Sequence, residues 1–463
     1  MARMPAVRTV HVCQQCGAES PRWSGQCPSC QAWNTLVETV VARPTTVAAR
    51  GRQRGALTAL PVGTISPITD VSSAEAQRLV SGIGEVDRVL GGGFVPGSIV
   101  LFGGDPGIGK STLLLQLAAR LANARGSVLY VTGEESAAQV RGRAERIGAV
   151  TGGLGLVATT ELSTALGAIE SEAPILAVVD SVQTLASDAL SGPAGSVGQV
   201  REVAARLAEV AKAGRTCVAL VGHVTKEGTV AGPRTLEHLV DAVIYLEGER
   251  LGSTRLIRAA KNRFGSTDEV GVLEMRSDGL MEVSDASRFF LESEQPPVAG
   301  SAITIALEGT RPLAVEIQAL VAPSGGGSPR RATTGIDVNR VLMLIAVLAR
   351  HAGLNLTGHD VYVNVAGGLR IEEPAADLAV AMALASSLRE RPVRAGTVLA
   401  GELSLAGRIR QATRADRRLA EARRLGFETL ITGTAHGGGA DRDVHLVTAT
   451  DVREAVRLAL EVA

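Results

Sequence analysis

Gly104-Asp105-Pro106-Gly107-Ile108-Gly109-Lys110-Ser111 is the stretch that decides the fold class, because it fits the pattern G-x-x-x-x-G-K-[ST]. It follows the apolar run 98–102, which has the length of a strand, and it precedes 112–118, which begins as a helix. A strand, a glycine-rich loop and a helix in this order predict a phosphate-binding P-loop.

The chemistry of this loop points to a nucleoside triphosphate, ATP or GTP. Its glycines let backbone N–H groups close around a phosphate, and the helix N-terminus adds a partial positive charge. Lys110 is expected to reach the β- and γ-phosphates, and the hydroxyl of Ser111 to ligate Mg²⁺. The expected nucleotide-binding residues are Gly104, Asp105, Pro106, Gly107, Ile108, Gly109, Lys110, Ser111, Thr112 and, from a later strand, Asp180.

The composition indicates a globular protein of two or three domains. The chain has 463 residues, of which 45% are hydrophobic and 20% charged, and 47 basic residues balance 47 acidic ones. This balance favours no partner by bulk charge, so any nucleic-acid site must be local. No apolar run is long enough to span a bilayer or to act as a signal peptide. We therefore expect a cytoplasmic protein without a membrane partner.

Four of the five cysteines form two pairs near the start of the chain, Cys13 with Cys16 and Cys27 with Cys30. Two CxxC pairs can place four thiolates in a tetrahedron, which Zn²⁺ accepts in closed structural sites. Residues 1–35 are therefore predicted to be a zinc module that depends on its metal for folding. A pair of disulfides is the alternative, which the CxxC spacing and the absence of a secretion signal disfavour.

Residues 36–75 are expected to form a flexible basic linker. Between 39 and 69 the chain has four arginines and no acidic residue, and it lacks sustained periodicity. A dedicated phosphate-binding arm is the alternative, and the linker is favoured.

Residues 76–285 are predicted to form an α/β ATPase domain. Apolar, β-branched runs alternate with helical stretches, which is typical of a parallel sheet covered on both faces; the runs are 127–132, 175–180, 216–222 and 242–246. Asp180 ends one of these strands, 70 residues after Lys110, and this Walker B pattern is expected to hold Mg²⁺.

A second acidic strand end supplies the candidate for water activation. Glu134 and Glu135 follow the strand 128–132. An ATP-hydrolysing site needs a group that orients water towards the γ-phosphate, and we assign this role to Glu134, with Glu135 as its neighbour or substitute. The alternative is that these carboxylates only stabilise a helix N-terminus.

The order of five segments resembles the bacterial RadA (Sms) family of recombination proteins. These are GDPGIGKST from 104, VTGEES from 131, ILAVVDS from 175, VGHVTKEG from 221 and KNRFG from 261. The cysteine module and the C-terminal region follow that family's order, so the resemblance covers nearly the whole chain. It implies an α/β fold class: a RecA-like, parallel-sheet P-loop ATPase core, a small N-terminal zinc module and a C-terminal α+β domain like that of Lon proteases.

The resemblance also implies an ATP site shared between subunits of a hexameric ring. Lys261 and Arg263 match the family motif that reaches the neighbour's γ-phosphate, and the rest of that motif is Asn262, Phe264 and Gly265. Such a cation can raise the hydrolysis rate by roughly 10³- to 10⁵-fold. On the residues alone, a solvated basic turn after the strand 254–259 is the simpler interpretation.

Two glycine-rich loops are expected to face the channel of that ring. The resemblance implies that His223 senses the γ-phosphate and that Lys226 and Arg234 contact DNA phosphates. The second loop is 191–196. Neither loop has aromatic residues for base stacking, so DNA contacts should be independent of sequence and sensitive to salt.

Residues 286–463 resemble the proteolytic domain of Lon proteases without its Ser–Lys dyad. Ala375 stands where those enzymes have the nucleophilic serine, and no lysine occurs after Lys261. Arginine stays protonated and cannot replace the lysine as a base. The domain is predicted to be catalytically inactive and to serve assembly. The arginine-rich stretch 408–424 is either a solvated surface or a DNA-binding face.

The motifs predict an ATPase, and the resemblance implies that it is DNA-dependent and acts in recombinational DNA repair. By resemblance, it binds ATP, Mg²⁺ and structural Zn²⁺, acts on single-stranded and branched DNA beside a RecA-type recombinase, and promotes branch migration or the extension of strand exchange. The alternative is a nucleotide-gated regulatory ring without motor activity on DNA. An ATP-driven protease is disfavoured by the missing serine and lysine.

Overall fold

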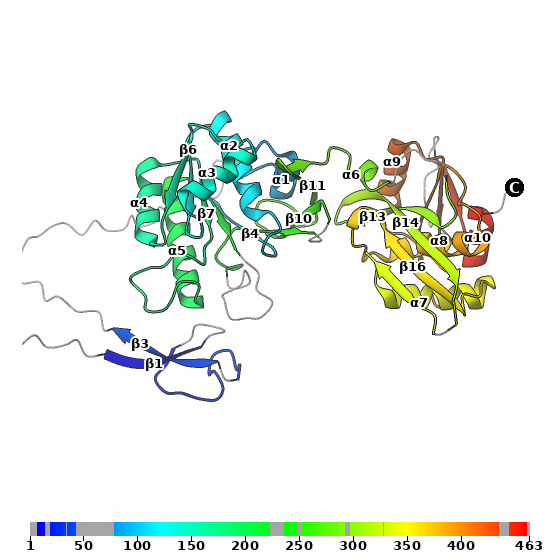
Figure 1. Ribbon diagram of the computed structural model, residues 1–463, viewed down its shortest axis with the longest axis horizontal. Helices are drawn as coiled ribbons and strands as arrows, with labels where there is room; N and C mark the ends of the chain where they lie inside the picture. The colour runs from blue at the N-terminus through cyan, green and yellow to red at the C-terminus, as the bar shows by residue number, and fades with distance from the viewer. Residues whose placement is uncertain are drawn as a thin grey trace, which may run out of the picture.

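The computed structural model describes residues 7–13, 19–33, 35–42, 78–222, 236–248, 252–291, 297–326, 328–434 and 444–460. These residues form three sheets (Figure 1). The smallest lies in the cysteine module, where β1 pairs antiparallel with both other strands; its strands are β1 (Val7–Cys13), β2 (Glu19–Ser20) and β3 (Leu36–Ala42). No helix in the described ranges is long and apolar enough to cross a membrane.

The central sheet has a parallel part and an antiparallel extension. Its described strands lie in the order β12-β11-β10-β9-β4-β8-β7-β5-β6. The six strands from β9 to β6 are parallel, whereas β10, β11 and β12 each run antiparallel to the strand before them. The bounds are β4 (Ile99–Gly103), β5 (Val128–Thr132), β6 (Leu154–Ala158), β7 (Leu176–Asp180), β8 (Cys217–Val221), β9 (Ala242–Glu247), β10 (Thr254–Asn262), β11 (Val270–Arg276) and β12 (Gly279–Glu282).

Helices cover both faces of this sheet, as the apolar strands predict (Figure 1). Alternate residues of β4 enter separate cores: Val100 and Phe102 pack on the side of α2, and Ile99 and Leu101 on the side of α5. The first side has α1 (Gly84–Leu90), α2 (Lys110–Ala124) and α3 (Ala137–Arg146), and the second has α4 (Leu162–Glu172) and α5 (Val197–Gly214).

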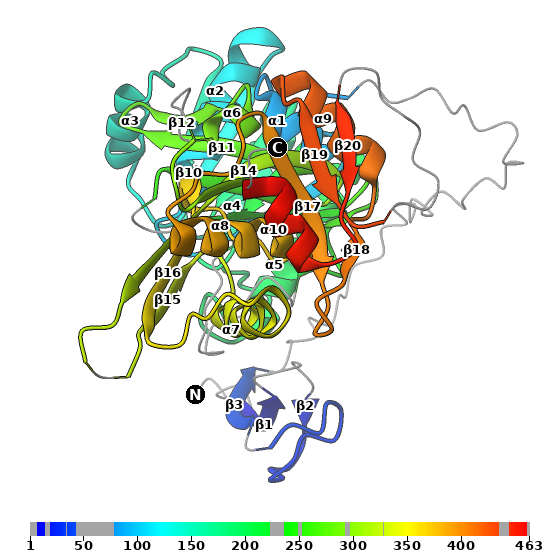
Figure 2. The same ribbon diagram turned by 90° about the vertical axis from the view of Figure 1, so that its right-hand side faces the viewer.

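The C-terminal part has a mixed sheet with the order β15-β16-β14-β13-β17-β19-β20, and β18 pairs with β17. Its strands are β13 (Ser301–Glu308), β14 (Arg311–Pro323), β15 (Arg331–Thr334), β16 (His359–Val365), β17 (Thr397–Leu403), β18 (Ile409–Gln411), β19 (Thr429–Thr432) and β20 (His445–Thr448). Its helices are α6 (Ala286–Phe289), α7 (Val338–Val347), α8 (Asp377–Arg389), α9 (Ala415–Leu425) and α10 (Val452–Leu460), with short helical turns at Leu348–Ala352, Ala366–Gly368 and Pro374–Ala376. The buried helix α8 packs on β14 and β17, and α10 lies beside it (Figure 2).

Several element boundaries are not evident from the sequence alone. The arginine-containing segment after β14 ends in the short strand β15, which pairs parallel with β16. The expected turn at 261–262 is instead the end of β10, after a bulge between Ala259 and Lys261. The last described helix, α10, is preceded by β20 and begins at Val452. These elements pair with distant strands, so local periodicity does not reveal them.

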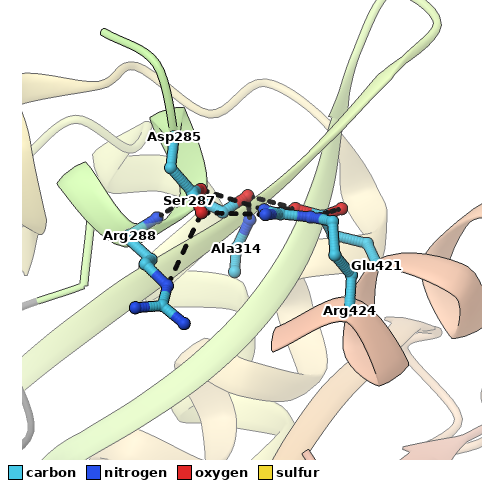
Figure 3. A network of polar contacts seen from close by, with 6 residues as sticks. All are labelled: Asp285, Ser287, Arg288, Ala314, Glu421 and Arg424. Carbon is cyan, nitrogen blue, oxygen red and sulfur yellow. Dashed lines mark hydrogen bonds and ion pairs between the residues drawn. The ribbon is translucent and has the colours of Figure 1, made fainter. Parts of the chain in front are cut away.

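A polar network fastens the start of the C-terminal part to helix α9 (Figure 3). Asp285, which precedes α6, accepts two hydrogen bonds from Arg424 at 2.8 and 2.9 Å. The same guanidinium contacts Glu421, which accepts a 2.5 Å bond from the hydroxyl of Ser287. The Ser287 oxygen in turn accepts the N–H of Ala314. The side chains therefore tie the connector after β12 to both β14 and α9.

Candidate nucleotide site

The phosphate-binding loop lies at the carboxyl end of β4, directly before α2. Gly104 and Gly109 have φ values of +144° and +116°, which side-chain-bearing residues rarely adopt. A Cβ at Gly104 would also collide with the carbonyl oxygen of Leu246 on the neighbouring strand. The loop therefore needs glycine for its backbone shape and for its close approach to β9.

Lys110 begins α2 and folds back over this loop. Its Nζ donates to the carbonyl oxygens of Gly104 at 2.8 Å and Asp105 at 3.0 Å. Burial lowers the pKa of Lys110, and the carboxylates of Asp180 and Glu134 oppose this shift. The amine and both predicted carboxylates thus lie within electrostatic reach of one another.

Asp180 ends β7 with its two carboxylate oxygens in different surroundings. Oδ2 accepts a 2.6 Å hydrogen bond from the hydroxyl of Tyr130. Oδ1 is buried and has no hydrogen-bond partner among the described residues. A buried anionic oxygen without a donor is the group that a hard cation would satisfy. Asp180 therefore fits a Mg²⁺ ligand, together with the partly exposed Ser111 at the start of α2.

The two acidic residues after β5 have different neighbours. Glu134 accepts a 2.5 Å hydrogen bond from the hydroxyl of Ser181, which directly follows Asp180. Glu135 instead forms an ion pair with Arg143 of α3, also at 2.5 Å. The structure therefore brings Glu134 to Lys110 and Asp180, whereas Glu135 is engaged with a helix beside the site.

Tyr130 and Ser181 belong to this site although the sequence analysis did not select them. Tyr130 pairs in register with Val178 of β7, two residues before Asp180. Burial, followed by the nearby Asp180 carboxylate, raises the pKa of Tyr130 well above its ordinary value, so the phenol keeps its proton and donates. A tyrosine among the aliphatic residues Val128, Leu129 and Val131 is the sequence signal that could have identified it.

The KNRFG segment lies beside the amino ends of β9 and β4, whereas the P-loop of the same chain follows the carboxyl end of β4. Lys261 Nζ donates to the carbonyl oxygens of Glu237 and Val240 at 2.6 and 2.8 Å. Arg263 forms a 2.9 Å ion pair with Asp241, and its side chain is 53% exposed. Asp241 precedes β9 and accepts the N–H of Ile99, the first residue of β4.

The remaining motif residues anchor this segment to the end of α1. Asn262 donates to the carbonyl oxygen of Val89, and its own side-chain oxygen accepts the N–H of Phe264. Arg78 donates to the carbonyl of Phe264, and Gly265 packs against Gly91. The expected sensor and DNA-contacting residues, His223, Lys226 and Arg234, lie outside the described residues.

Three of the four predicted zinc ligands converge. The sulfur atoms of Cys13, Cys27 and Cys30 lie within 4.8 Å of one another, and those of Cys13 and Cys30 are 3.6 Å apart. Two thiolates on one tetrahedral zinc are about 3.8 Å apart, whereas a disulfide requires about 2 Å. This geometry fits Zn²⁺ and excludes a Cys13–Cys30 disulfide. Cys16 lies outside the described residues.

In the C-terminal part, Ala375 is 5% exposed within a short helical turn before α8. The neighbouring Glu373 forms an ion pair with Arg418, which is fully buried and also donates to the carbonyl of Ile305. With Arg418 buried and Arg424 held by Asp285, the arginines of 408–424 do not share one solvent-exposed face. This placement disfavours the hypothesis of a DNA-binding face made by the whole stretch.

Comparison with known proteins agrees with this architecture. Residues 11–38 match the family described as rubredoxin metal binding domain, residues 67–229 the AAA domain, and residues 336–435 the subunit ChlI of Mg-chelatase. The AAA match and the loop geometry identify an ATPase domain, which implies ATP and Mg²⁺.

Proteins named DNA repair protein RadA match nearly the whole chain. The protein from Bacillus subtilis is 46% identical over 99% of this chain and 100% of its own length. The protein from Listeria monocytogenes is 45% identical over 98% of both, and one from Streptococcus pyogenes is 46% identical over 92% of both. The chain therefore belongs to the RadA family of DNA repair proteins.

Proposed function

We propose that this protein is a DNA-dependent ATPase motor of recombinational DNA repair. It would bind single-stranded DNA and promote branch migration or the extension of strand exchange, working beside a RecA-type recombinase. The family, whose members carry the name of DNA repair proteins, supports the biological role. The ATPase domain supports nucleotide hydrolysis as the energy source.

The observation that carries the proposal is the position of Arg263 relative to the P-loop. Strand β10 runs antiparallel to β9, so its last residues lie at the amino ends of β9 and β4. The P-loop follows the carboxyl end of β4, about 13 Å away along the strand. Arg263 therefore cannot serve the nucleotide of its own chain without a rearrangement. It is available to a neighbouring subunit, which favours a ring, proposed to be a hexamer.

Within such a shared site, each residue of this chain has a distinct proposed role. Lys110 binds the β- and γ-phosphates, and Glu134 orients the attacking water and accepts its proton. Ser111 and Asp180 would hold Mg²⁺, which neutralises the charge on the phosphates. Arg263 of the adjacent subunit stabilises the negative charge of the transition state.

The contacts of the KNRFG segment suggest different roles for its two cations. Lys261 is held by two backbone carbonyls of its own chain, whereas the side chain of Arg263 is half exposed. We therefore assign the γ-phosphate contact to Arg263 and a positioning role to Lys261. In this respect the structure favours one of the two cations that the sequence leaves open.

We also propose that the C-terminal domain (286–463) has no peptidase activity and serves ring assembly. The side chain of Ala375 is a methyl group and cannot act as a nucleophile. The nearby Arg418 is an ion-paired guanidinium and cannot act as a base. The other proposed units are the zinc module, the linker and the ATPase domain (76–285). The sequence-based boundary between the first two, at 35 and 36, is corrected by β3 (Leu36–Ala42), which pairs with β1 and so belongs to the zinc module; the proposed linker therefore begins after Ala42 and ends at 75.

The test is steady-state ATP hydrolysis with and without single-stranded DNA across a salt titration. The motor proposal predicts stimulation by DNA that fades as salt rises, because the contacts are to phosphates. Lys110→Ala and Arg263→Ala should each abolish the stimulated rate. A wild-type hydrolysis rate that is the same with and without DNA would refute the motor proposal and favour the regulatory ring.

A further inference from the structure

Arg255 is a buried arginine behind the phosphate-binding loop, and none of the sequence motifs includes it. It lies on β10 with only 5% of its surface exposed. Its Nε donates to the carbonyl oxygen of Ile108 at 3.0 Å, and its Nη1 donates to those of Gly252 at 2.6 Å and Thr254 at 2.9 Å. A guanidinium from the antiparallel extension thus contacts the centre of the P-loop.

The contacted carbonyl belongs to the peptide unit between Ile108 and Gly109. In a trans peptide, the C=O and the following N–H point in opposite directions within one plane. A donor that holds the Ile108 oxygen on one side therefore aims the Gly109 N–H to the other side. Backbone N–H groups at this point of a P-loop are those that bind phosphate.

This peptide unit needs an external restraint because glycines flank Ile108. Gly107 and Gly109 have φ values of +80° and +116°, and glycine tolerates a rotated peptide at little steric cost. The Gly109 N–H has no backbone acceptor in the described part of the chain. The bond from Arg255 is thus the described polar contact that fixes which way this N–H points.

We propose that Arg255 is a positioning residue for nucleotide binding, which orients the Ile108–Gly109 peptide so that its N–H faces the nucleotide phosphates. The inference deepens the proposed function, because it concerns the same ATP site. The arginine acts through the loop backbone rather than by touching the nucleotide. Its charge behind the loop also favours the phosphate anion.

The position of Arg255 also connects the loop with the C-terminal domain. The preceding residue, Thr254, donates from Oγ1 to the carbonyl of Gly367 at 2.8 Å. Arg258, which lies three residues after Arg255, forms a 2.6 Å ion pair with Glu308 of β13. The strand segment that holds the P-loop peptide is therefore itself held by the C-terminal domain.

The test compares Arg255→Met and Arg255→Lys in the full-length chain without DNA. Arg255→Met keeps an unbranched, buried side chain and removes every donor, while Arg255→Lys keeps the charge and a donor. We expect Arg255→Met to raise the Kd for ADP and the KM for ATP by about 10- to 100-fold, the value of one charge-assisted hydrogen bond. The kcat should change little, because the N–H binds ground state and transition state alike. Arg255→Lys should restore part of the affinity.

Arg258→Met is the matched control, because Arg258 lies on the same strand and contacts the C-terminal domain instead of the P-loop. Its nucleotide affinity should stay within about twofold of the wild type, because the ion-pair partners of Arg258, Glu247 and Glu308, are not P-loop residues and β10 remains paired with β9 and β11. If Arg255→Met does not fold, Arg255→Leu takes its place, because it also removes every donor, and a Kd equal to that of the wild type in folded Arg255→Leu refutes the proposal. Unchanged Kd and KM in a folded Arg255→Met refute it directly. A wild-type chain that binds no ADP would instead refute the nucleotide site itself.

Discussion

Replacing Tyr130 with phenylalanine removes one oxygen atom from the wall of the nucleotide site. Tyr130 is 1% exposed and Asp180 is 6% exposed, and the phenol donates a 2.6 Å hydrogen bond to Asp180 Oδ2. The other carboxylate oxygen already lacks a described partner. Tyr130→Phe therefore leaves a buried carboxylate with both oxygens unsatisfied and its orientation unrestrained.

The expected magnitude follows from this geometry. A hydrogen bond to a charged group contributes about 1.5–3 kcal/mol. Removing a group that orients a metal ligand typically weakens metal affinity by about 10- to 100-fold. The melting temperature of the ATPase domain should fall by about 3–12 °C, given about 2–4 °C per kcal/mol at this domain size. We therefore expect both a stability loss and a shifted dependence on Mg²⁺.

The assay is a Mg²⁺ titration of ATP hydrolysis at fixed ATP, together with thermal unfolding of the same samples. The half-saturating Mg²⁺ concentration should rise by at least about tenfold in Tyr130→Phe. Tyr362→Phe is the control, because that tyrosine lies on β16 and is 37% exposed. A Mg²⁺ dependence and a melting temperature both equal to those of the wild type would refute the proposed link between Tyr130 and the metal ligand.

Three further predictions concern other parts of the chain. Glu134→Gln should lower kcat by about 10²- to 10⁴-fold while Glu135→Gln changes it only a few-fold; equal losses in steady-state assays would contradict the assignment. Arg424 lowers the pKa of Asp285 to about 2, so this carboxylate should stabilise the fold above about pH 4 and lose that contribution as the pH falls towards 2. Acid unfolding of Asp285→Asn should lack that pH-dependent part, and a profile identical to the wild type's would speak against it. The wild-type chain should contain one tightly bound zinc by elemental analysis and Cys27→Ser should lose it, whereas zinc retained by the variant would refute the ligand set.

The parts of the site that could be predicted from the sequence are those that depend on local patterns. The P-loop and the strand ending at Asp180 have apolar runs and a glycine spacing that only a strand–loop–helix unit satisfies, and the structure forms both. The same local reasoning locates Glu134 and Glu135 together. It cannot separate them, because their roles depend on Ser181 and Arg143, which come from other segments.

The parts that could not be predicted depend on contacts between distant segments. Arginine is usually exposed, so the burial of Arg255 in β10 has no local sequence signal. Its acceptor, Ile108, is 147 residues away in the chain. The burial of Arg418 likewise has no local sequence signal, because it depends on Glu373 and on the carbonyl of Ile305, which come from other segments. Register and packing decide such roles.

The most direct test of the central claim, an ATP site completed by the neighbouring subunit, is a mixing experiment. Lys110→Ala lacks the phosphate-binding amine but keeps Arg263, whereas Arg263→Ala has the opposite defect. In an equimolar mixed ring, about a quarter of the sites pair an intact Lys110 with an intact Arg263 from the adjacent chain. We predict that the two inactive variants recover about a quarter of the wild-type DNA-stimulated ATPase rate when they are mixed. A mixture that assembles with the wild-type subunit number and stays inactive would contradict a shared site.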